Sequence, residues 1–288
     1  DNLGDWSSDV CSSDLSYGII RLPKGTPTSL AYVSNTTLVV GCTDHTVFLY
    51  NLKSGEVIRR FRGHRGIVNS VDVQHGGAGK GLIVTGSDDG TVRVWSDESK
   101  EEVEVVELGY PITAVRVSLS CAEAGTAADV VLDQQVKWSE DGQSIYIGGV
   151  DNDVHVFSLS QHAISYTLRG HTDTITSLSL CPTSSQLLTS SMDSVLHLWS
   201  VQPFAPTLNT ANPALHPRLI RSFYGAPAGF EGLLRKASWS KHSTQITGGG
   251  SMVAIGGADR ALTVWDSTTG EIRYKVIRYV SSSTLRRC

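Results

Sequence analysis

The stretch Asp89-Gly-Thr-Val-Arg-Val-Trp95 decides the fold of this chain, because it occurs in five versions. In each version an aspartate is followed six residues later by an aromatic residue, with alternating and β-branched residues between them. This pattern predicts a tight turn that leads into a β-strand. The other four copies run from Asp44 to Tyr50, from Asp151 to Phe157, from Asp193 to Trp199, and from Asp259 to Trp265. The chain is therefore built from an internal repeat.

The spacing of these turn aspartates predicts the architecture. Successive aspartates are separated by 45, 62, 42 and 66 residues. Two of these intervals match the period of roughly 40 to 45 residues that is typical of four-stranded propeller blades. Around the second copy, segments 67–73, 82–85 and 91–95 are predicted strands, and an outer strand follows them. No segment has the period of an amphipathic helix. We therefore expect an all-β β-propeller with about five blades.

Composition excludes several classes of protein. The 288-residue chain has a formal net charge of −4, which gives no general attraction to nucleic acids or anionic membranes. Its five cysteines form no CxxC pair and no zinc-site spacing, as expected in a reducing intracellular compartment. No apolar run reaches the roughly 18 residues needed to cross a bilayer. We expect a soluble protein with no contact to a membrane.

The repeat also divides the chain into segments. Residues 1–15 match a translated sequencing adapter and are excluded from the fold as non-native. Residues 16–276 are expected to form the blades, and residues 277–288, which contain no further repeat, a tail foreign to the family. The two long spacings predict insertions at about 116–135 and 203–231. Translated intron is the favoured explanation of the first, with a loop insertion as the alternative, and the second is predicted to be a proline-rich surface excursion.

Two of the five copies share polar residues that the other three lack. Each has a Gly-His pair before its first strand and hydroxyl residues four and two positions before the turn aspartate. This set predicts a buried network in which the aspartate orients the histidine, the histidine meets a hydroxyl, and the hydroxyl meets the tryptophan N–H. The predicted members are His64, Thr85, Ser87, Asp89 and Trp95 in one copy, and His171, Thr189, Ser191, Asp193 and Trp199 in the other. The remaining copies are expected to have lost the network as a whole.

The same residues must be weighed against an enzymatic interpretation. His64, Ser87 and Asp89 are the residue types of a Ser-His-Asp hydrolase. The set occurs twice, however, and neither copy has a nucleophile elbow or an oxyanion motif. The glycine-rich stretch 75–81 lacks the first glycine and the final Ser/Thr of a phosphate-binding loop, so it is predicted to be a hairpin turn. We expect no catalytic residue, no cofactor, no metal and no small-molecule substrate.

The repeats resemble WD40 repeats, and several stretches resemble in particular the family of WD40 subunits of the U5 small nuclear ribonucleoprotein of the spliceosome. These stretches are 85–95, 148–157, 166–180, 201–206 and 230–240. The resemblance covers about residues 30–276. It implies a non-enzymatic nuclear scaffold that contacts large U5 proteins during pre-mRNA splicing. It also implies seven blades, so we expect this chain to form an incomplete or open propeller.

The resemblance leaves partner contacts and other functions to be weighed. On propeller geometry, Asp88 and Met192 beside the turn aspartates are expected to face a partner. Pro203, Phe204 and Pro206 form a second expected contact, in the proline-rich excursion. The alternative functions are those of a substrate receptor for a ubiquitin ligase or a signalling scaffold of the G-protein β kind. The sequence indicates no surface for RNA.

Overall fold

A computed structural model of the chain describes residues 20, 22–74, 81–97, 99, 101–117, 144–181, 185–202, 215–229, 235–240 and 251–277. Within these ranges the only regular secondary structure is β-strand, and the strands form five separate four-stranded antiparallel sheets. In every sheet the four strands lie in the order in which they occur along the chain. Each sheet is one blade, so the predicted all-β fold of about five blades is confirmed.

The five blades are defined by their strands. Blade 1 contains β1 (Pro27–Ser34), β2 (Thr37–Cys42), β3 (Thr46–Asn51) and β4 (Val57–Arg62). Blade 2 contains β5 (Val68–Gln74), β6 (Leu82–Ser87), β7 (Thr91–Ser96) and β8 (Glu102–Glu107). Blade 3 contains β9 (Ile112–Val117), β10 (Ser144–Gly149), β11 (Val154–Ser158) and β12 (Ala163–Leu168). Blade 4 contains β13 (Ile175–Leu180), β14 (Gln186–Ser191), β15 (Leu196–Ser200) and β16 (Leu219–Phe223). Blade 5 contains β17 (Ser238–Trp239), β18 (Met252–Gly256), β19 (Ala261–Asp266) and β20 (Ile272–Ile277).

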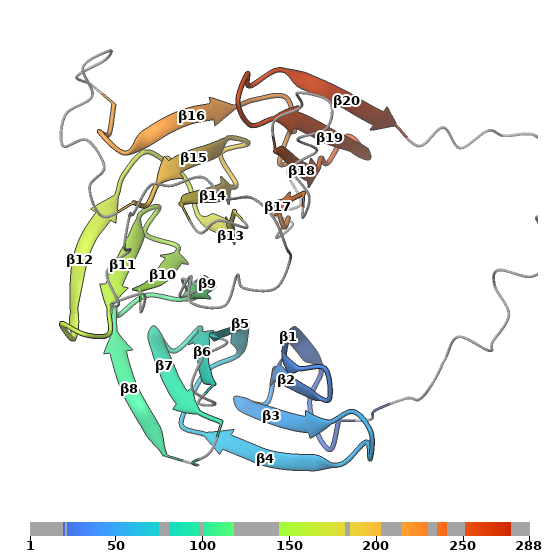
Figure 1. Cartoon of the computed structure of the whole chain (residues 1–288), viewed down its shortest axis with the longest axis vertical. Coiled ribbons are helices and arrows are strands. Elements are labelled where there is room, and N and C mark those ends of the chain that lie inside the picture. The colour runs from blue at the N-terminus through green and yellow to red at the C-terminus, as the bar shows by residue number, and fades with distance from the viewer. Residues whose placement is uncertain are drawn as a thin grey trace, which may run out of the picture.

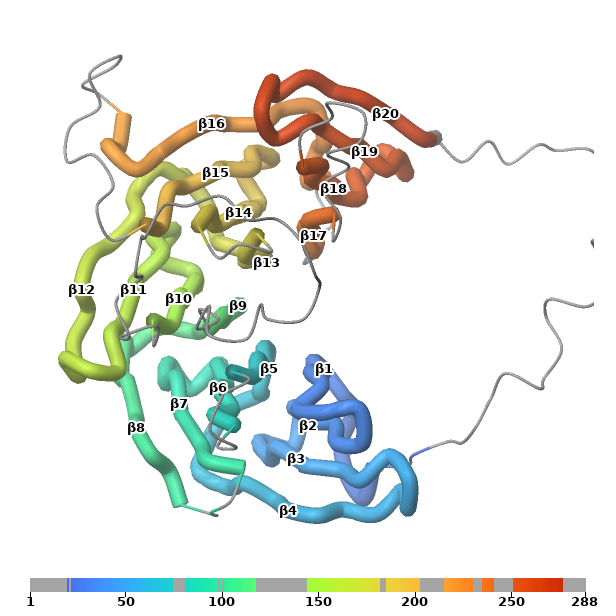
Figure 2. Tube along the Cα trace, viewed as in Figure 1, coloured from blue at the N-terminus to red at the C-terminus, as the bar shows by residue number. Residues whose placement is uncertain are grey.

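The blades stand side by side around an arc, with the first strand of each blade near the centre and the fourth at the periphery (Figure 1). The chain trace shows the same order, from blade 1 at one end of the arc to blade 5 at the other (Figure 2). The arc is open between these two blades. The expected incomplete propeller is therefore what the structure shows.

The turn aspartates shape the same tight turn in all five blades. The residue after each aspartate has a positive φ angle: His45 66°, Gly90 77°, Asn152 68°, Ser194 69° and Arg260 59°. In blades 2 and 4 the aspartate Oδ1 accepts the backbone N–H two residues later, over 2.9 Å at Thr91 and 2.8 Å at Val195. This side-chain bond holds a left-handed turn without requiring glycine, which only blade 2 uses there.

Apolar residues join each blade to the next. In blade 2, one face of the sheet carries Val84, Val92, Val94 and Val106, and these pack against the innermost strand of blade 3. Three further clusters of the same kind join blades 1 and 2, 3 and 4, and 4 and 5. Most of the core is thus divided among four inter-blade interfaces, as in a repeat protein in which each unit packs on its neighbours. A fifth cluster, around Phe48 and Tyr50, lies within blade 1.

Serine hydroxyls add hydrogen bonds to three of these interfaces. The Oγ atoms of Ser29, Ser70 and Ser177 each accept a backbone N–H from the following blade, over 3.2 Å in every case. The donors lie in the innermost strand or, for Ser177, at the residue just before it. The sequence analysis missed this role, although Ser29 and Ser70 lie at the same position in β1 and β5.

Three predicted segment boundaries need correction. β9 continues to Val117, two residues into the insertion predicted at 116–135. The excursion predicted at 203–231 includes β16, which pairs with β15 as the outermost strand of blade 4, because every blade requires a fourth strand. β20 ends at Ile277, which the prediction assigned to the tail. Residues 1–15, 118–135 and 203–214 lie outside the described residues.

Candidate functional site

The polar residues predicted for blade 2 come together in the structure. His64, just before β5, lies with its Nδ1 3.0 Å from Asp89 Oδ2, in the turn between β6 and β7. Its Nε2 lies 2.7 Å from Thr85 Oγ1 on β6. The same hydroxyl accepts a hydrogen bond from Trp95 Nε1 on β7 over 3.0 Å. Two strands, the turn between them and the segment before β5 are therefore linked by one continuous chain of hydrogen bonds.

Blade 4 repeats this geometry closely. His171 Nδ1 lies 2.9 Å from Asp193 Oδ2, and its Nε2 lies 2.7 Å from Thr189 Oγ1. Trp199 Nε1 donates to the same hydroxyl over 2.9 Å. The two threonines and the two tryptophan rings are completely or almost completely buried. Two copies with the same bonds indicate a building unit of the blade rather than a unique reactive centre.

The bonding partners define the protonation of the chain. An indole N–H can only donate, so the Trp95 N–H donates to Thr85 and the threonine O–H donates to His64 Nε2. The remaining N–H of His64, on Nδ1, then donates to Asp89. Burial lowers the pKa of His64 despite the attraction of Asp89, which keeps the imidazole neutral.

Asp89 is held as an anion by its hydrogen bonds. Burial acts to raise its pKa, but hydrogen bonds from Thr91 and from the backbone N–H of Arg65 outweigh burial and lower the pKa to about 2. The same balance lowers the pKa of Asp193. A neutral histidine beside a carboxylate that is fully hydrogen-bonded is a stable arrangement at neutral pH.

Ser87 and Ser191 do not complete a catalytic triad. Ser87 Oγ accepts the backbone N–H of Asp89 over 3.3 Å, and Ser191 Oγ accepts that of Asp193 over 3.2 Å. Ser191 also donates to the carbonyl of Asp173 over 2.7 Å. Both serines are completely buried, and in the described part of the chain it is the threonine of each blade that bonds to the histidine. A buried hydroxyl that is committed to the backbone has no access to a substrate.

Blade 3 departs from the expectation that the network is lost as a whole. Asp151 lies 2.7 Å from Nε2 of His155, which stands on β11 rather than before the innermost strand. His155 Nδ1 is 3.2 Å from Thr167 Oγ1 on β12. The ring of Tyr110, which precedes β9, lies beside this pair, with its centroid 6.1 Å from that of His155. The sequence signal for this pair was the Asp-x-x-x-His spacing from Asp151 to His155. Asp151 lies in the turn before β11, and His155 lies on that strand.

Blades 1 and 5 satisfy their repeat residues in other ways. In blade 5, Trp265 Nε1 donates to the backbone carbonyl of Tyr224 over 3.2 Å, which replaces the missing threonine. Asp259 pairs with Lys275 over 2.9 Å. In blade 1, Asp44 accepts only the backbone N–H of Thr46, over 3.3 Å, among the bonds of the described residues. The Tyr50 hydroxyl is buried without a hydrogen-bond partner in that part of the chain. Phe157 is a buried apolar residue of blade 3.

His197 is a buried polar residue that the sequence analysis missed. It stands on β15, and its ring centroid is 4.2 Å from that of His171. Its Nδ1 lies 2.9 Å from Ser222 Oγ, and its Nε2 lies 3.4 Å from the carbonyl of Gly170. Burial, reinforced by the neighbouring His171, lowers the pKa of His197 to about 4. In β15, His197 lies between the core residues Leu196 and Leu198, and nothing in this local pattern predicts its contact with His171.

The residues predicted to face a partner differ in accessibility. Asp88 is exposed beside the turn of blade 2, where its Oδ1 accepts a hydrogen bond from Asn69 Nδ2 over 2.5 Å. Met192 is half-buried in the equivalent turn of blade 4. Pro203, Phe204 and Pro206 lie outside the described residues. The described ranges contain no cluster of three or more His, Cys, Asp or Glu side chains suited to a metal ion. They also contain no helix long and apolar enough to cross a membrane.

Known β-propeller and splicing proteins are similar in sequence to this chain over most of its length. The β-propeller family described as "Nucleolar protein 10-like, N-terminal domain" matches residues 9–216. Pre-mRNA-splicing factor cwf17 of Schizosaccharomyces pombe is 32% identical over 260 residues, which cover 90% of this chain and 64% of the relative. The human U5 small nuclear ribonucleoprotein 40 kDa protein is 32% identical over 230 residues, which cover 80% of this chain and 54% of the relative. Human WD repeat-containing protein 37 is 22% identical over 266 residues, or 83% of this chain and 47% of the relative. The chain thus spans about half to two thirds of the length of these relatives.

Proposed function

Because the chain belongs to the β-propeller family of the nucleolar protein 10-like N-terminal domain, we propose that it is a non-enzymatic scaffold that binds protein partners. The process we propose is pre-mRNA splicing in the nucleus, within the U5 small nuclear ribonucleoprotein. One observation carries this proposal: 32% identity over 80 to 90% of the chain to relatives named as a splicing factor and a U5 protein. The partners we propose are large proteins of the U5 particle.

The geometry of the polar residues supports binding rather than catalysis. A hydrolytic site needs an accessible nucleophile beside its base and a pocket for the substrate. In blades 2 and 4 the histidine instead forms hydrogen bonds with the aspartate and with the threonine hydroxyl within the blade. Thr85 and Thr189 are completely buried. These networks hold the blades in shape, and the surfaces of the blades remain for partners.

We assign the partner contacts to the rim of turns beside the repeat aspartates. Asp88 in blade 2 and Val150 in blade 3 are exposed at equivalent positions of this rim, and Met192 in blade 4 is half-buried. The neighbouring residues of one rim thus include an acidic, an aliphatic and a thioether side chain. A mixed surface of this kind suits a protein partner better than the uniformly anionic backbone of RNA. Pro203, Phe204 and Pro206 are proposed as a second contact on the basis of sequence alone.

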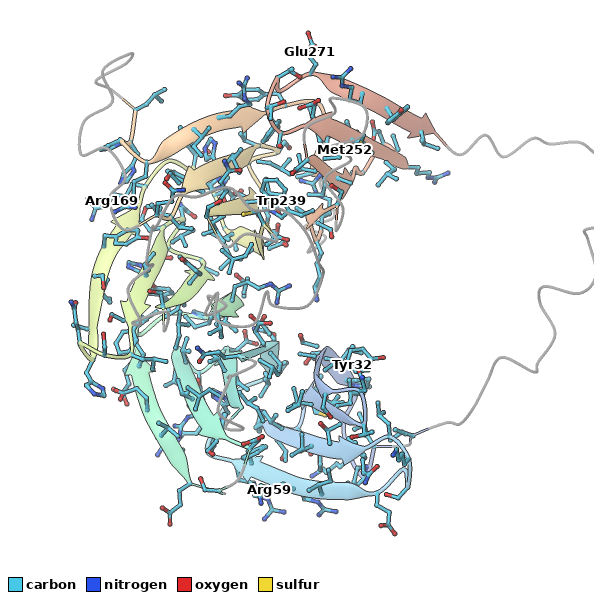
Figure 3. The ribbon with its side chains drawn as sticks, viewed as in Figure 1. Tyr32, Arg59, Arg169, Trp239, Met252 and Glu271 are labelled. Carbon is cyan, nitrogen blue, oxygen red and sulfur yellow. The ribbon has the colours of Figure 1, made fainter. Side chains whose placement is uncertain are left out.

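The test is affinity purification of the tagged gene product from a nuclear extract, followed by mass spectrometry. Recovery of U5 particle proteins with the wild-type protein is the expected result. A matched pair of variants localises the contact. Asp88→Lys on the rim should reduce recovery, and Glu271→Lys, the same kind of charge reversal at an exposed residue just before β20, should leave it unchanged. Glu271 lies at the outer edge of the arc (Figure 3). Recovery of a cullin-type ubiquitin ligase or a G-protein γ-like partner without U5 proteins would refute the proposal.

A further inference from the structure

One position on the third strand of blades 2, 3 and 4 carries a basic side chain, and its partners differ from blade to blade. Arg93 on β7, His155 on β11 and His197 on β15 each pair with the second-strand residue that stands four positions before the turn aspartate. Arg93 forms an ion pair with Glu102 on β8. His155 lies 2.7 Å from Asp151. In blades 2 and 3 the basic group at this position therefore lies beside a carboxylate.

His197 has no carboxylate bonded to it in the part of the chain that the structure describes. Asp193, in the turn of the same blade, is already engaged. Its Oδ2 lies 2.9 Å from His171 Nδ1 and accepts the backbone N–H of Thr172 over 3.1 Å, and its Oδ1 accepts that of Val195 over 2.8 Å. The ring centroids of His171 and His197 are 4.2 Å apart. Two buried imidazoles in contact thus share one carboxylate.

The partners of His197 hold it in the neutral form. The carbonyl of Gly170 can only accept, so the ring proton lies on Nε2, 3.4 Å from that oxygen. Nδ1 then accepts from the hydroxyl of Ser222 on β16 over 2.9 Å. If a proton were added to Nδ1, the hydroxyl could reverse and accept, but it supplies no negative charge. The charge of the imidazolium would stay uncompensated.

The other neighbours of His197 offer no further negative charge. The Trp199 ring stands edge-on to it, with the centroids 5.4 Å apart, and His216 lies on Trp199 at 5.6 Å. The nearby cations Arg169 and Arg218 are bonded to a carboxylate of blade 3 and to backbone carbonyls. Apart from the shared carboxylate, a charged His197 would be surrounded by neutral and positive groups, which is costly in a buried site.

β16 is the strand that covers His197 at the outer edge of blade 4. It is the last strand of the sheet and pairs, among the described strands, with β15 alone (Figure 1). Ser222 is paired with His197 in the register of the two strands. A short edge strand opens at a lower free energy than the strands inside a sheet. His197 therefore reaches water most directly when β16 separates from β15.

β16 also connects blade 4 to blade 5. Arg221 on β16 donates to the backbone carbonyls of Thr268 and Thr269, over 2.8 and 2.7 Å, in the turn between β19 and β20. The ring of Phe223 lies 5.9 Å from that of Trp265 in blade 5. Separation of β16 would break both contacts, so an event at His197 would be transmitted to the neighbouring blade.

We propose that the contact between His197 and β16 is a pH-sensitive switch, in which uptake of a proton by His197 beside His171 releases β16 from β15 while the other strands of the blade stay folded. The released strand lets the imidazolium reach water and loosens the outer edge of blade 5. The corresponding groups of blades 2 and 3 should not respond in this way, because each keeps a carboxylate beside it. The switch is independent of the proposed role in splicing.

The test is hydrogen exchange of the purified full chain, followed by mass spectrometry at pH 7.5 and at pH 5. Protection factors compare each amide with an unfolded chain at the same pH, which removes the chemical pH dependence of exchange. Burial and the neighbouring His171 lower the pKa of His197 to about 4, against 6.5 in water, so opening of β16 should become about 30-fold more favourable at pH 5. The protection of β16 should fall by that factor.

β12 of blade 3 is the matched control within the same chain. His155 occupies the position of His197 and lies beside Asp151, so the protection of β12 should not change. Protection of β16 that is constant with pH overturns the proposal. An equal loss in β12 also overturns it, because the event would then be general unfolding.

Two variants separate charge from hydrogen bonding. His197→Asn removes the group that takes up the proton, so the protection of β16 should no longer depend on pH. Ser222→Ala removes only the hydrogen bond, so it should lower protection at pH 7.5 and keep the response of about 30-fold, because the charge on His197 is still uncompensated. A response that survives His197→Asn, or one that is lost in Ser222→Ala, overturns the proposal. If His197→Asn does not fold, the comparison of β16 with β12 in the wild type still decides it.

Discussion

Removing one hydroxyl from the buried network of blade 2 should destabilise the protein strongly. Thr85→Val keeps the size and branching of the side chain but removes the Oγ1 that accepts from Trp95 and contacts His64. Two buried polar groups, the Trp95 N–H and His64 Nε2, are then left without this partner. Each unpaired buried group costs about 1–3 kcal/mol, so the free energy of unfolding should fall by about 2–6 kcal/mol.

Steric effects do not account for this loss. Val40 and Ile147 occupy the same strand position in blades 1 and 3, so the position accepts an apolar side chain. Thr263→Val is the matched control, because Thr263 is also a completely buried threonine on a blade strand. Its hydroxyl has no hydrogen-bond partner among the described residues, so its removal should leave stability unchanged or raise it.

The assay is urea unfolding followed by tryptophan fluorescence, with the midpoint compared at a constant slope. Thr85→Val should lower the midpoint clearly, and Thr263→Val should not. Equal midpoints for the two variants would refute the argument that hydrogen bonding to Trp95 and His64, rather than the threonine side chain as such, stabilises blade 2. The double variant Thr85→Val, His64→Ala should lose less than the sum of the single changes, because the two residues share one network.

Three further predictions follow from the turns and from the buried histidine. Asp89→Ala should lower the free energy of unfolding by about 1–3 kcal/mol, since it leaves the histidine N–H unpaired, whereas the exposed neighbour changed by Asp88→Ala should have little effect in the same urea assay. His45→Gly should raise the melting temperature, because the exposed His45 holds a φ of 66°, where non-glycine residues carry a penalty of roughly 1–2 kcal/mol that the greater freedom of glycine in the unfolded chain partly offsets. Gly90→Ala, at a φ of 77°, should lower it. Burial lowers the pKa of His197 from 6.5 to about 4, so below pH 6.5 the unfolded chain binds a proton that the folded chain does not, and stability should fall by up to about 3 kcal/mol between pH 6.5 and 4. His197→Asn should flatten the melting temperature over that range, and an unchanged slope would contradict the role of this histidine.

Local patterns predicted the repeat unit well. The run from Asp89 to Trp95 contains both the turn and the strand β7, because the side-chain bond of the aspartate and the alternation of valines act within a few residues. The network around His64 could also be predicted. Its members occur together in blades 2 and 4, because a buried hydrogen-bond network is costly when only part of it is satisfied.

Contacts between distant segments were harder to predict. His155 replaces the missing Gly-His histidine of blade 3 from another strand, and only the fold shows that it reaches Asp151 and Thr167 together. The strand β16 lies in a proline-rich stretch, and its pairing with β15, rather than its own composition, makes it a strand. The contact between the rings of His197 and His171 likewise depends on two segments that meet only in the folded blade.

Five blades in an open arc scatter X-rays differently from a closed ring, and small-angle scattering of the purified chain tests this arrangement most directly. The pair-distance distribution should match the open arc of Figure 1, with the long distances that separate the two ends of a gap. A distribution that matches a compact, closed ring, in which blades 1 and 5 touch, would contradict the open propeller.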